Sequence, residues 1–339
     1  MNAERFAAIT ARYPSLRVGV VGDFFLDRYL MIDPTKSELS IETGLPVHNV
    51  LAVQSRPGAA GTILNNLVAL GVGTIHAIGY RGDDGEGYEL QRALAAQPGV
   101  LLGHFLTSKT RRTPVYCKPL LIEEGKPPVE LNRFDSKNWT TTPIDLQMEL
   151  ADRVIEVGSE VDVLLVLEQV DLPDTGVVTP SLNAAVLHVL KERPEVVVLA
   201  DSRQGLGHFP PFIFKMNAAE LGRMTGGDTS DLAAVKIQAS RHATANAQPV
   251  FVTLAEQGIV GARPGEPAEH VAAYPIRGPI DIVGAGDSVT ANLAVALAAG
   301  ASLREAMALA MAAASIVIHQ LGTTGTASVS SLSKQLGYF

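Results

Sequence analysis

The stretch Asp162-Val163-Leu164-Leu165-Val166-Leu167 is the clearest guide to the fold of this chain. Five consecutive apolar residues without polar alternation are typical of a strand that is buried on both faces of a sheet. A helical pattern precedes this run at residues 143–157, and another follows at 180–191. Strands that alternate with helices of this length predict an α/β fold with a mostly parallel central sheet and helices on both faces.

The same alternation continues on both sides of this stretch. Residues 18–21 (VGVV) read as a buried strand that ends at Gly22-Asp23, and residues 62–70 read as a helix. Further along the chain, the apolar runs at 74–78, 196–200 and 250–254 read as strands. Residues 231–247 show a helical pattern.

Two segments, 30–56 and 105–135, break the pattern. They contain extended runs in which apolar residues alternate with polar or charged ones, and they lack a helical period. We expect them to form a small antiparallel β lid inserted into one domain that spans residues 1–339. Such a lid could cover a substrate and exclude water. Two ordinary surface hairpins are the alternative, which composition does not reject.

The composition narrows the class of protein. The chain has 339 residues, a net charge of −8 and 47% hydrophobic residues, which predicts a large buried core. The acidic balance argues against a nucleic-acid or membrane-surface partner. The single cysteine, Cys117, excludes an internal disulfide and a cysteine-based zinc cluster and fits a cytoplasmic protein. The first 14 residues lack the apolar core of a secretory signal, and no uninterrupted apolar stretch is long enough to span a bilayer.

Residues 281–287 (DIVGAGD) carry the chemistry, and an apolar helical run follows them at once. The small residues Gly284, Ala285 and Gly286 let backbone N–H groups approach a ligand closely. A helix start adds unpaired N–H donors that favour an anion such as phosphate. Asp287 is then placed to take a proton from a hydroxyl that attacks the phosphate. The pattern predicts a phosphotransferase.

These residues resemble the C-terminal signature of the ribokinase-like (PfkB) carbohydrate kinase family. Four further motifs stand in the order of that family, at residues 21–29 (VGDFFLDRY), 56–71, 215–220 (KMNAAE) and 252–258 (VTLAEQG). The first is most similar to the heptose-phosphate kinase branch. Several motifs in order are more specific than any one of them. The resemblance implies an ATP-dependent kinase with a ribokinase-like fold that uses Mg²⁺ and acts on a sugar or a sugar phosphate.

The resemblance also implies roles for individual residues. Asp287 is the expected base, and the segment Gly284 to Gly286 is the expected anion hole. Asn217 and Glu220 are expected to hold Mg²⁺ through water, because this ion usually keeps several waters. Thr253 and Gly258 are expected to bind the nucleotide as well. The expected substrate-binding residues are Asp23, Asp27, Gly58, Ala59 and Thr62.

The substrate side departs from the family pattern. Ala59 stands where the sugar motif has a second glycine, and Thr62 stands where it has an asparagine. Residues 168–171 (EQVD) replace a Ser-Asp-Tyr-like turn of the heptose-phosphate kinases. The phosphate side is intact, so the reaction type is kept while the acceptor stays open. A sensor that binds sugar and nucleotide without catalysis and a nucleoside kinase remain alternatives, although only 5% of the residues are aromatic.

Three further expectations concern ions and partners. The family resemblance suggests a potassium site near Asp281, to which Val283 would contribute its carbonyl. Residues 201–203 (DSR) follow a strand and could line the cleft near the triphosphate. An exposed strand edge on the lid would invite pairing with a second copy, so we expect a homodimer through the lid.

Overall fold

The computed structural model describes residues 1–322 and 324–338 of the chain. Across these residues, ten strands form a central sheet in the order β17-β16-β15-β14-β13-β12-β1-β6-β7, with β8 also paired to β6. All pairs are parallel except β15 with β16 and β16 with β17. The predicted α/β class with a mostly parallel sheet is confirmed. The strands are β1 (Arg17–Gly22), β6 (Thr74–Gly82), β7 (Val100–Leu101), β8 (Phe105–Ser108), β12 (Val163–Glu168), β13 (Val197–Ser202), β14 (Ile213–Asn217), β15 (Val250–Thr253), β16 (Ile259–Ala262) and β17 (Glu269–Val271).

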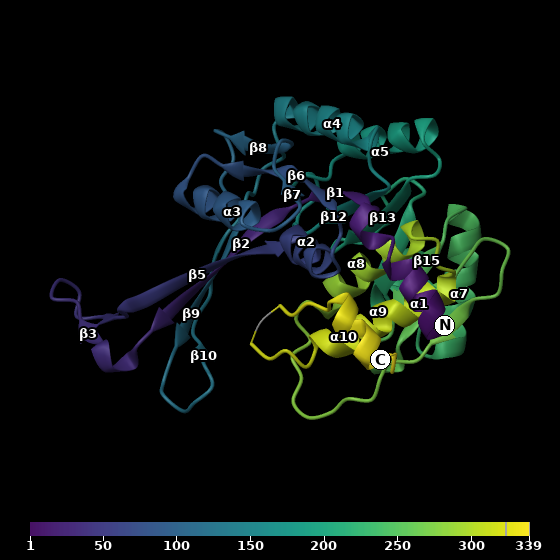
Figure 1. The fold of residues 1–339 in the computed structure, drawn as a ribbon. Coiled ribbons are helices and arrows are strands. Elements are labelled where there is room, and N and C mark those ends of the chain that lie inside the picture. The colour runs from purple at the N-terminus through teal and green to yellow at the C-terminus, as the bar shows by residue number, and fades with distance from the viewer. Residues whose placement is uncertain (323, 339) are drawn as a thin grey trace.

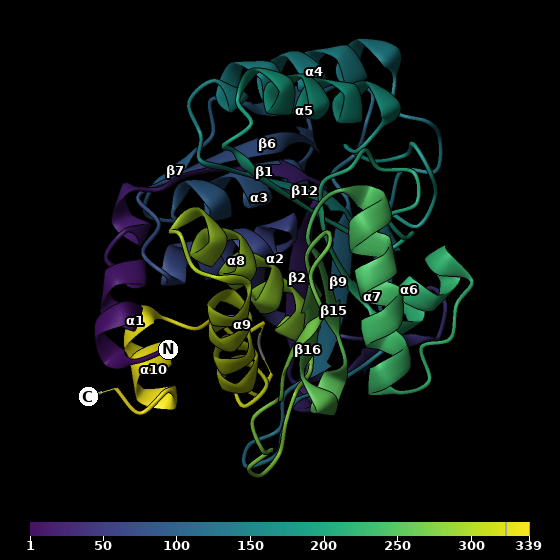
Figure 2. The same cartoon turned by 90° about the vertical axis from the view of Figure 1, so that its right-hand side faces the viewer.

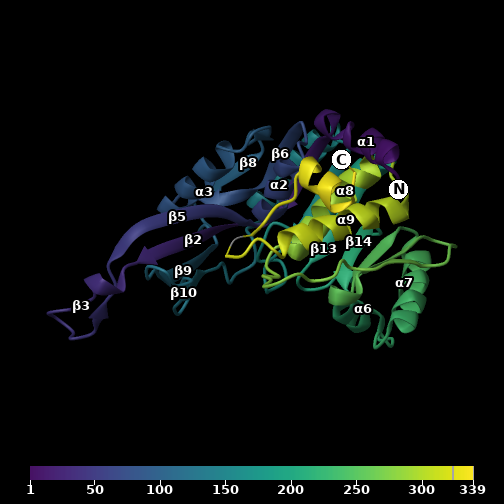
Figure 3. The same cartoon turned by 60° about the horizontal axis from the view of Figure 1, so that its bottom comes forward.

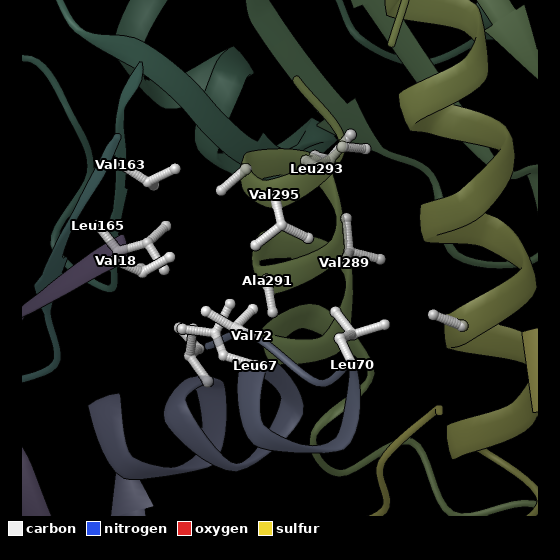
Figure 4. Packing of buried hydrophobic residues seen from close by; sticks show 14 of the residues in the cluster. Val18, Leu67, Leu70, Val72, Val163, Leu165, Val289, Ala291, Leu293 and Val295 are labelled. Carbon is white, nitrogen blue, oxygen red and sulfur yellow. The ribbon is translucent and has the colours of Figure 1, made fainter. Parts of the chain in front are cut away.

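The apolar strands are buried on both faces because their side chains alternate between two hydrophobic cores. In β12, Val163 and Leu165 belong to one core, while Leu164 and Val166 belong to the other. Figure 4 shows the first core, where Val18 and the odd-numbered β12 residues lie near Leu67 and the side chains of α8. The uninterrupted apolar run at 163–167 therefore has a direct physical cause.

Helices cover both faces of this sheet, as predicted. In Figure 2, α4 and α5 lie above strands β6, β1 and β12, and α8 and α9 lie below them. Within the described residues, no helix combines the length and apolar character needed to cross a membrane. The helices are α1 (Ala3–Thr10), α2 (Ala60–Ala69), α3 (Gly85–Ala95), α4 (Ile144–Gly158), α5 (Pro180–Glu192), α6 (Ala218–Thr225), α7 (Leu232–Asn246), α8 (Ala285–Ala298), α9 (Leu303–Val317) and α10 (Val329–Gln335).

A second sheet projects from this body as a long arm, seen at the left of Figures 1 and 3. It contains five strands among the described residues, in the order β10-β9-β2-β5, with β11 paired to β9. We call this sheet the lid. At its tip, β3 (Glu38–Leu39) pairs with β4 (Pro46–Val47). The lid strands are β2 (Phe24–Ile32), β5 (Val50–Ala59), β9 (Val115–Leu121), β10 (Val129–Glu130) and β11 (Phe134–Ser136).

The lid differs from the sequence expectation in two respects. It is mixed rather than antiparallel, because β2 pairs with β9 in parallel, from Leu26 opposite Val115 to Ile32 opposite Leu121. Residues 105–108 are part of the central sheet, where β8 pairs with β6. The ring of Phe105 packs edge-on against Phe24 at 5.2 Å, which holds this segment to the body. The division of the chain into one domain stays a prediction.

Candidate active site

The candidate residues gather at one edge of the central sheet, where its parallel strands end. Asp23 follows β1, Glu168 ends β12, Asp201 lies near the end of β13, Asn217 ends β14, and Thr253 ends β15. Open α/β sheets bind ligands outside the carboxyl ends of their strands. Motifs that are far apart in the sequence are therefore brought to one edge.

The DIVGAGD motif forms the start of α8. Gly284 is the N-cap, with φ of 82°, and it offers the first helical turn no side-chain cap. The N–H of Ala285 already donates to the carbonyl of Ile282 at 3.2 Å. The N–H groups of Gly286 and Asp287 lie too early in the helix for an intrahelical partner. Of the predicted anion hole, the Gly286 end is therefore the part best suited to bind an anion.

Asp287 lies in the first turn of α8. Burial and the negative charge of Asp201 raise its pKa to about 7, although Lys215 and Arg203 oppose the shift. A carboxyl whose pKa is near neutrality is matched to the task of a general base. The environment of Asp287 thus suits the role predicted for it.

A buried ion pair lies beside this helix start. Lys215 Nζ of β14 is 2.8 Å from Asp201 Oδ2 of β13. The same carboxylate oxygen accepts a hydrogen bond from Thr290 Oγ1 at 2.9 Å. A Cβ placed on Gly286 would lie 3.3 Å from Lys215 Nζ, so the ammonium group lies against the anion-hole glycine. Lys215 stands inside a motif that the sequence singled out, but the sequence assigned it no role.

Asn217 and Glu220 bind one another at the start of α6. The Asn217 side chain accepts the N–H of Glu220 at 2.9 Å, and Glu220 Oε2 accepts the N–H of Asn217 at 2.7 Å. The two side chains thus form a capping box. This accounts for their spacing of three residues independently of any metal. One carboxylate offers about four acceptor positions, so Glu220 can also bind a water.

A cavity of about 550 Å³ lies beside α6 and the start of α8. Thr253 and Gly258 line it, as do Asn217 and Gly286. Asn217, Thr253 and Gly258 therefore meet in one cavity that reaches Gly286, whereas the fourth predicted nucleotide-binding residue, Glu220, is not part of its wall. Its remaining wall is mainly apolar and includes residues that the sequence did not single out, among them Tyr274, Ile276, Ile282, Val289, Met311 and Ile318.

Asp23 is held by the backbone of a neighbouring loop. Its Oδ2 accepts the N–H of Gln169 at 2.8 Å, and its Oδ1 accepts the N–H of Val177 at 2.7 Å. Burial raises the pKa of Asp23, and these backbone bonds oppose the shift. Asp23 therefore anchors the segment 169–177 after β12. Its contact with a sugar hydroxyl stays a prediction.

Asp27 and Gly58, two of the predicted substrate-binding residues, lie together in the lid strands. A Cβ on Gly58 would come within 2.6 Å of Asp27 Oδ2, so only glycine leaves room for this carboxylate. Lys118 Nζ of β9 lies 3.4 Å from Asp27 Oδ1. Burial raises the pKa of Asp27, while Lys118 lowers it.

Ala59 and Thr62, the two residues that depart from the sugar motif, lie at the start of α2. Ala59, the N-cap of α2, adopts φ of 55° and ψ of −119°, a conformation that favours glycine. Thr62 is only 3% exposed in the first turn of α2, so its hydroxyl is hardly accessible. Substrate binding by Ala59 and Thr62 stays a prediction.

A group of cations that the sequence did not identify lies where the lid meets the body. Arg203 Nη1 donates to Tyr116 Oη of β9 at 2.8 Å, and the guanidinium carbon of Arg133 lies 4.5 Å from the centre of the same ring. Together with Lys118 these arginines act electrostatically on Asp27. We call Lys118, Arg133 and Arg203 the basic cluster. No local sequence pattern marks it, because its members come from three separate segments.

The profile of the "pfkB family carbohydrate kinase" matches residues 29–329 of the chain. The protein belongs to this family. The family implies phosphoryl transfer to a sugar hydroxyl, with ATP as the phosphoryl donor, usually with Mg²⁺.

Curated relatives and solved structures agree with this assignment. The chain is 31% identical over 315 residues to the "Bifunctional protein HldE" of Azotobacter vinelandii and 30% identical over 320 residues to that of Pseudomonas fluorescens. Each match covers 92% of this chain but only 62% of the relative.

Two of the similar solved structures share the fold across almost their whole length. Arabidopsis thaliana ribokinase, solved with ribose and ATP, has a TM-score of 0.69 at 21% identity, and the match covers 96% of this chain and 99% of that one. Escherichia coli phosphofructokinase-2, solved with substrates and products, has a TM-score of 0.72 at 20% identity, with coverage of 95% and 99%. The ribokinase-like fold is confirmed.

Proposed function

We propose that the chain transfers the terminal phosphoryl group of ATP to a hydroxyl of a sugar phosphate, with Asp287 as the general base. The observation that carries the proposal is the placement of Asp287 in the first turn of α8, with burial that raises its pKa to about 7. A base of this kind is half ionised near neutral pH and can accept the hydroxyl proton as the oxygen attacks phosphorus.

The anion hole stabilises the charge on the migrating group. Phosphoryl transfer depends mainly on positioning and electrostatic stabilisation. The N–H groups of Gly286 and Asp287 point out of the helix start, while Gly284 and Ala285 shape the turn before it. The positive end of the α8 dipole adds to their effect.

The nucleotide is assigned to the cavity beside α6, where Thr253 and Gly258 line the wall. Asn217 and Glu220 suit a water-mediated Mg²⁺ site, because Glu220 Oε2 is occupied by its cap while Oε1 can accept a water. In the described residues, no three His, Cys, Asp or Glu side chains cluster in a way that would hold a metal by themselves. This agrees with an ion that takes its other ligands from phosphates, and such an ion would neutralise charge on the triphosphate.

The acceptor is assigned to the region beside Asp27 and the basic cluster, where the lid meets the body. The basic cluster there favours an acceptor that carries an anionic group, because arginine and lysine bind phosphate through charge-assisted hydrogen bonds. Asp27, beside the cluster, can accept a sugar hydroxyl. The similarity to HldE proteins makes a heptose phosphate the first acceptor to test.

A direct assay tests the reaction. The protein is incubated with ATP, Mg²⁺ and a panel of free sugars, sugar phosphates and nucleosides, and ADP release is measured. We expect ADP release that depends on the acceptor and is fastest with a sugar phosphate. Binding of ATP and sugar without ADP release would contradict the proposal and support a sensor, while a preference for nucleosides would support a nucleoside kinase.

A potassium ion near Asp281 is part of the proposal. Val283 N–H donates to Asp281 Oδ1 at 3.0 Å, and Asp281 N–H donates to the carbonyl of Ile318 at 2.8 Å, so the segment before the anion hole is tied to the end of α9. Among the similar structures, Escherichia coli phosphofructokinase-2 was solved with potassium. Equal rates with and without potassium in sodium-free buffer would contradict this site.

We also propose that two copies pair through their lids. Strands β5 and β10 form the two ends of the lid sheet order, and unpaired strand edges favour pairing with another chain. Exposed apolar side chains gather on the lid, which is typical of interaction surfaces. They are Leu39, Ile41, Leu45, Val50, Leu51, Val53, Ile122 and Val129.

Sedimentation at micromolar concentration tests this pairing. The wild-type protein should have the mass of a dimer, and a Val53→Asp variant should have the mass of a monomer, because a charge would be buried at the interface. A wild-type protein that sediments as a monomer would exclude the dimer.

A further inference from the structure

Lys215 is a buried cation for which the mechanism above has no use. Its side chain is almost fully enclosed, with the residue 8% exposed, and its Nζ lies 2.8 Å from Asp201 Oδ2. An opposite charge at this distance favours the charged form of a lysine. The lysine is therefore an ammonium ion in the folded protein.

Stability alone gives a weak reason for such a pair. Desolvation of two charges offsets much of their attraction, and apolar residues of similar volume often serve as well. The same strand shows this alternative, since Phe214 and Met216 on either side of Lys215 are buried in an apolar core. The position of the charge is more informative than its pairing.

The ammonium group lies at the anion hole. A Cβ on Gly286 would come within 3.3 Å of Lys215 Nζ, so the nitrogen faces the backbone of the helix start. Lys215 precedes Asn217 by two residues on β14, so it shares a strand with the proposed Mg²⁺ side of the site. Asp201 is itself held by Thr290 Oγ1 of α8, so the pair is fixed to the same helix as the anion hole.

We propose that Lys215 Nζ binds the terminal phosphoryl group of the nucleotide and neutralises it during transfer. The inference rests on the proposed function. In the step, the acceptor oxygen forms a bond to the terminal phosphorus, and the bond from that phosphorus to the bridging oxygen of ADP breaks. The hydroxyl proton passes to Asp287. Lys215 keeps its proton throughout and acts only as a cation.

The pairing with Asp201 has a role in this scheme. Asp201 holds the four-carbon side chain in one orientation, so that the ammonium need not be ordered when the phosphate arrives. Of its three donors, one binds Asp201 Oδ2 and the others can bind phosphate oxygens. A buried lysine supplies a compact point charge where a planar guanidinium would be crowded by the Gly286 backbone.

The test compares Lys215→Gln with the wild-type protein. Glutamine retains a hydrogen-bond donor for Asp201 but removes the charge, so it separates the phosphate contact from the structural tie. We expect kcat to fall by about 10²–10³-fold, the usual loss for one electrostatic stabiliser. The KM of the acceptor should change little. Lys191→Met, on the exposed surface of α5, is the control and should behave as wild type.

Equilibrium binding gives a second readout that does not depend on turnover. In EDTA, titration calorimetry should show that Lys215→Gln binds a non-hydrolysable ATP analogue at least ten-fold more weakly than wild type does, with unchanged affinity for AMP. A variant that keeps wild-type affinity for the ATP analogue and kcat within three-fold would overturn the inference. Lys215→Met, which fills a similar volume, replaces Lys215→Gln if the latter melts early.

The variant Asp287→Asn separates this inference from the proposed function. If Asp287→Asn turns over at the wild-type rate, the proposed function fails. If Asp287→Asn is inactive while Lys215→Gln matches the wild type in both readouts, only the role of Lys215 fails.

Discussion

The two ends of the active site are built differently. At the phosphate end, Asp287, Lys215 and Asp201 come from α8 and two central strands that are held between two hydrophobic cores. At the acceptor end, Asp27 and the basic cluster belong largely to the lid, which projects from the body (Figure 1). The phosphate end is suited to fixed electrostatics, and the acceptor end to variation in substrate. Changes at the first should alter kcat, and changes at the second should alter the KM of the acceptor.

The largest effect should come from the base. Asp287→Asn removes the proton acceptor but keeps the shape of the side chain, so kcat should fall by about 10²–10⁴-fold. The KM of the acceptor should stay near the wild-type value, because Asp27 and the basic cluster are unchanged. Steady-state ADP release measures both constants. A large rise in the acceptor KM with an unaltered kcat would remove the proposed contrast between the two ends.

The pH profile should report the same carboxyl. Because the pKa of Asp287 is about 7, kcat/KM should fall about ten-fold per pH unit below that value as the base becomes protonated. The folded-state pKa lies above the unfolded value of 3.8, so the folded state binds more protons between these values. This group should therefore make folding less favourable as pH rises from about 4 to about 7. Melting temperatures should then show that Asp287→Asn stabilises the protein at pH 8 more than at pH 5.

The lid end should show the opposite kinetic pattern. Arg133→Gln should raise the KM of a sugar phosphate by about 10-fold, as expected for loss of one charge-assisted hydrogen bond. Arg133 also pairs with Asp135 at 2.7 Å, so the expected ten-fold rise in KM includes the effect of losing this ion pair. The KM for ATP and kcat should stay within about three-fold. Unchanged KM for the phosphorylated acceptor would exclude Arg133 from the acceptor site.

The smallest effect concerns backbone strain where the lid joins the body. Ala59 adopts a conformation that favours glycine, and such strain costs on the order of 1–3 kcal/mol. Ala59→Gly should relieve this strain and stabilise the folded protein. Part of the gain is offset because glycine increases the conformational entropy of the unfolded chain. Thermal unfolding should show a rise of a few degrees. Gly71→Ala gives a matched reverse change, since Gly71 has φ of 77° in the turn after α2, and it should destabilise the protein.

Much of the nucleotide end could be predicted from sequence because its motifs are local. The turn from Gly284 to Asp287 and the pair of Asn217 and Glu220 each lie within one helix start, so spacing alone predicts their relative positions. The central strands could be predicted for the same reason, since an uninterrupted apolar run such as 163–167 can be recognised from neighbouring residues alone. The pairing of Lys215 with Asp201 could not be predicted, because Asp201 lies on another strand.

The sequence by itself determined the α/β architecture, the mostly parallel sheet and the place of the glycine-rich turn at a helix start, because hydrophobic periodicity and glycine-rich turns act over a few neighbouring residues. Only the tertiary structure decided what surrounds that turn. The pKa of Asp287, the use of both Asp23 oxygens by backbone amides, the parallel pairing of β2 with β9 and the basic cluster all depend on segments that meet in space. Burial and Coulomb interactions depend on distance in space, and distance along the chain does not predict them.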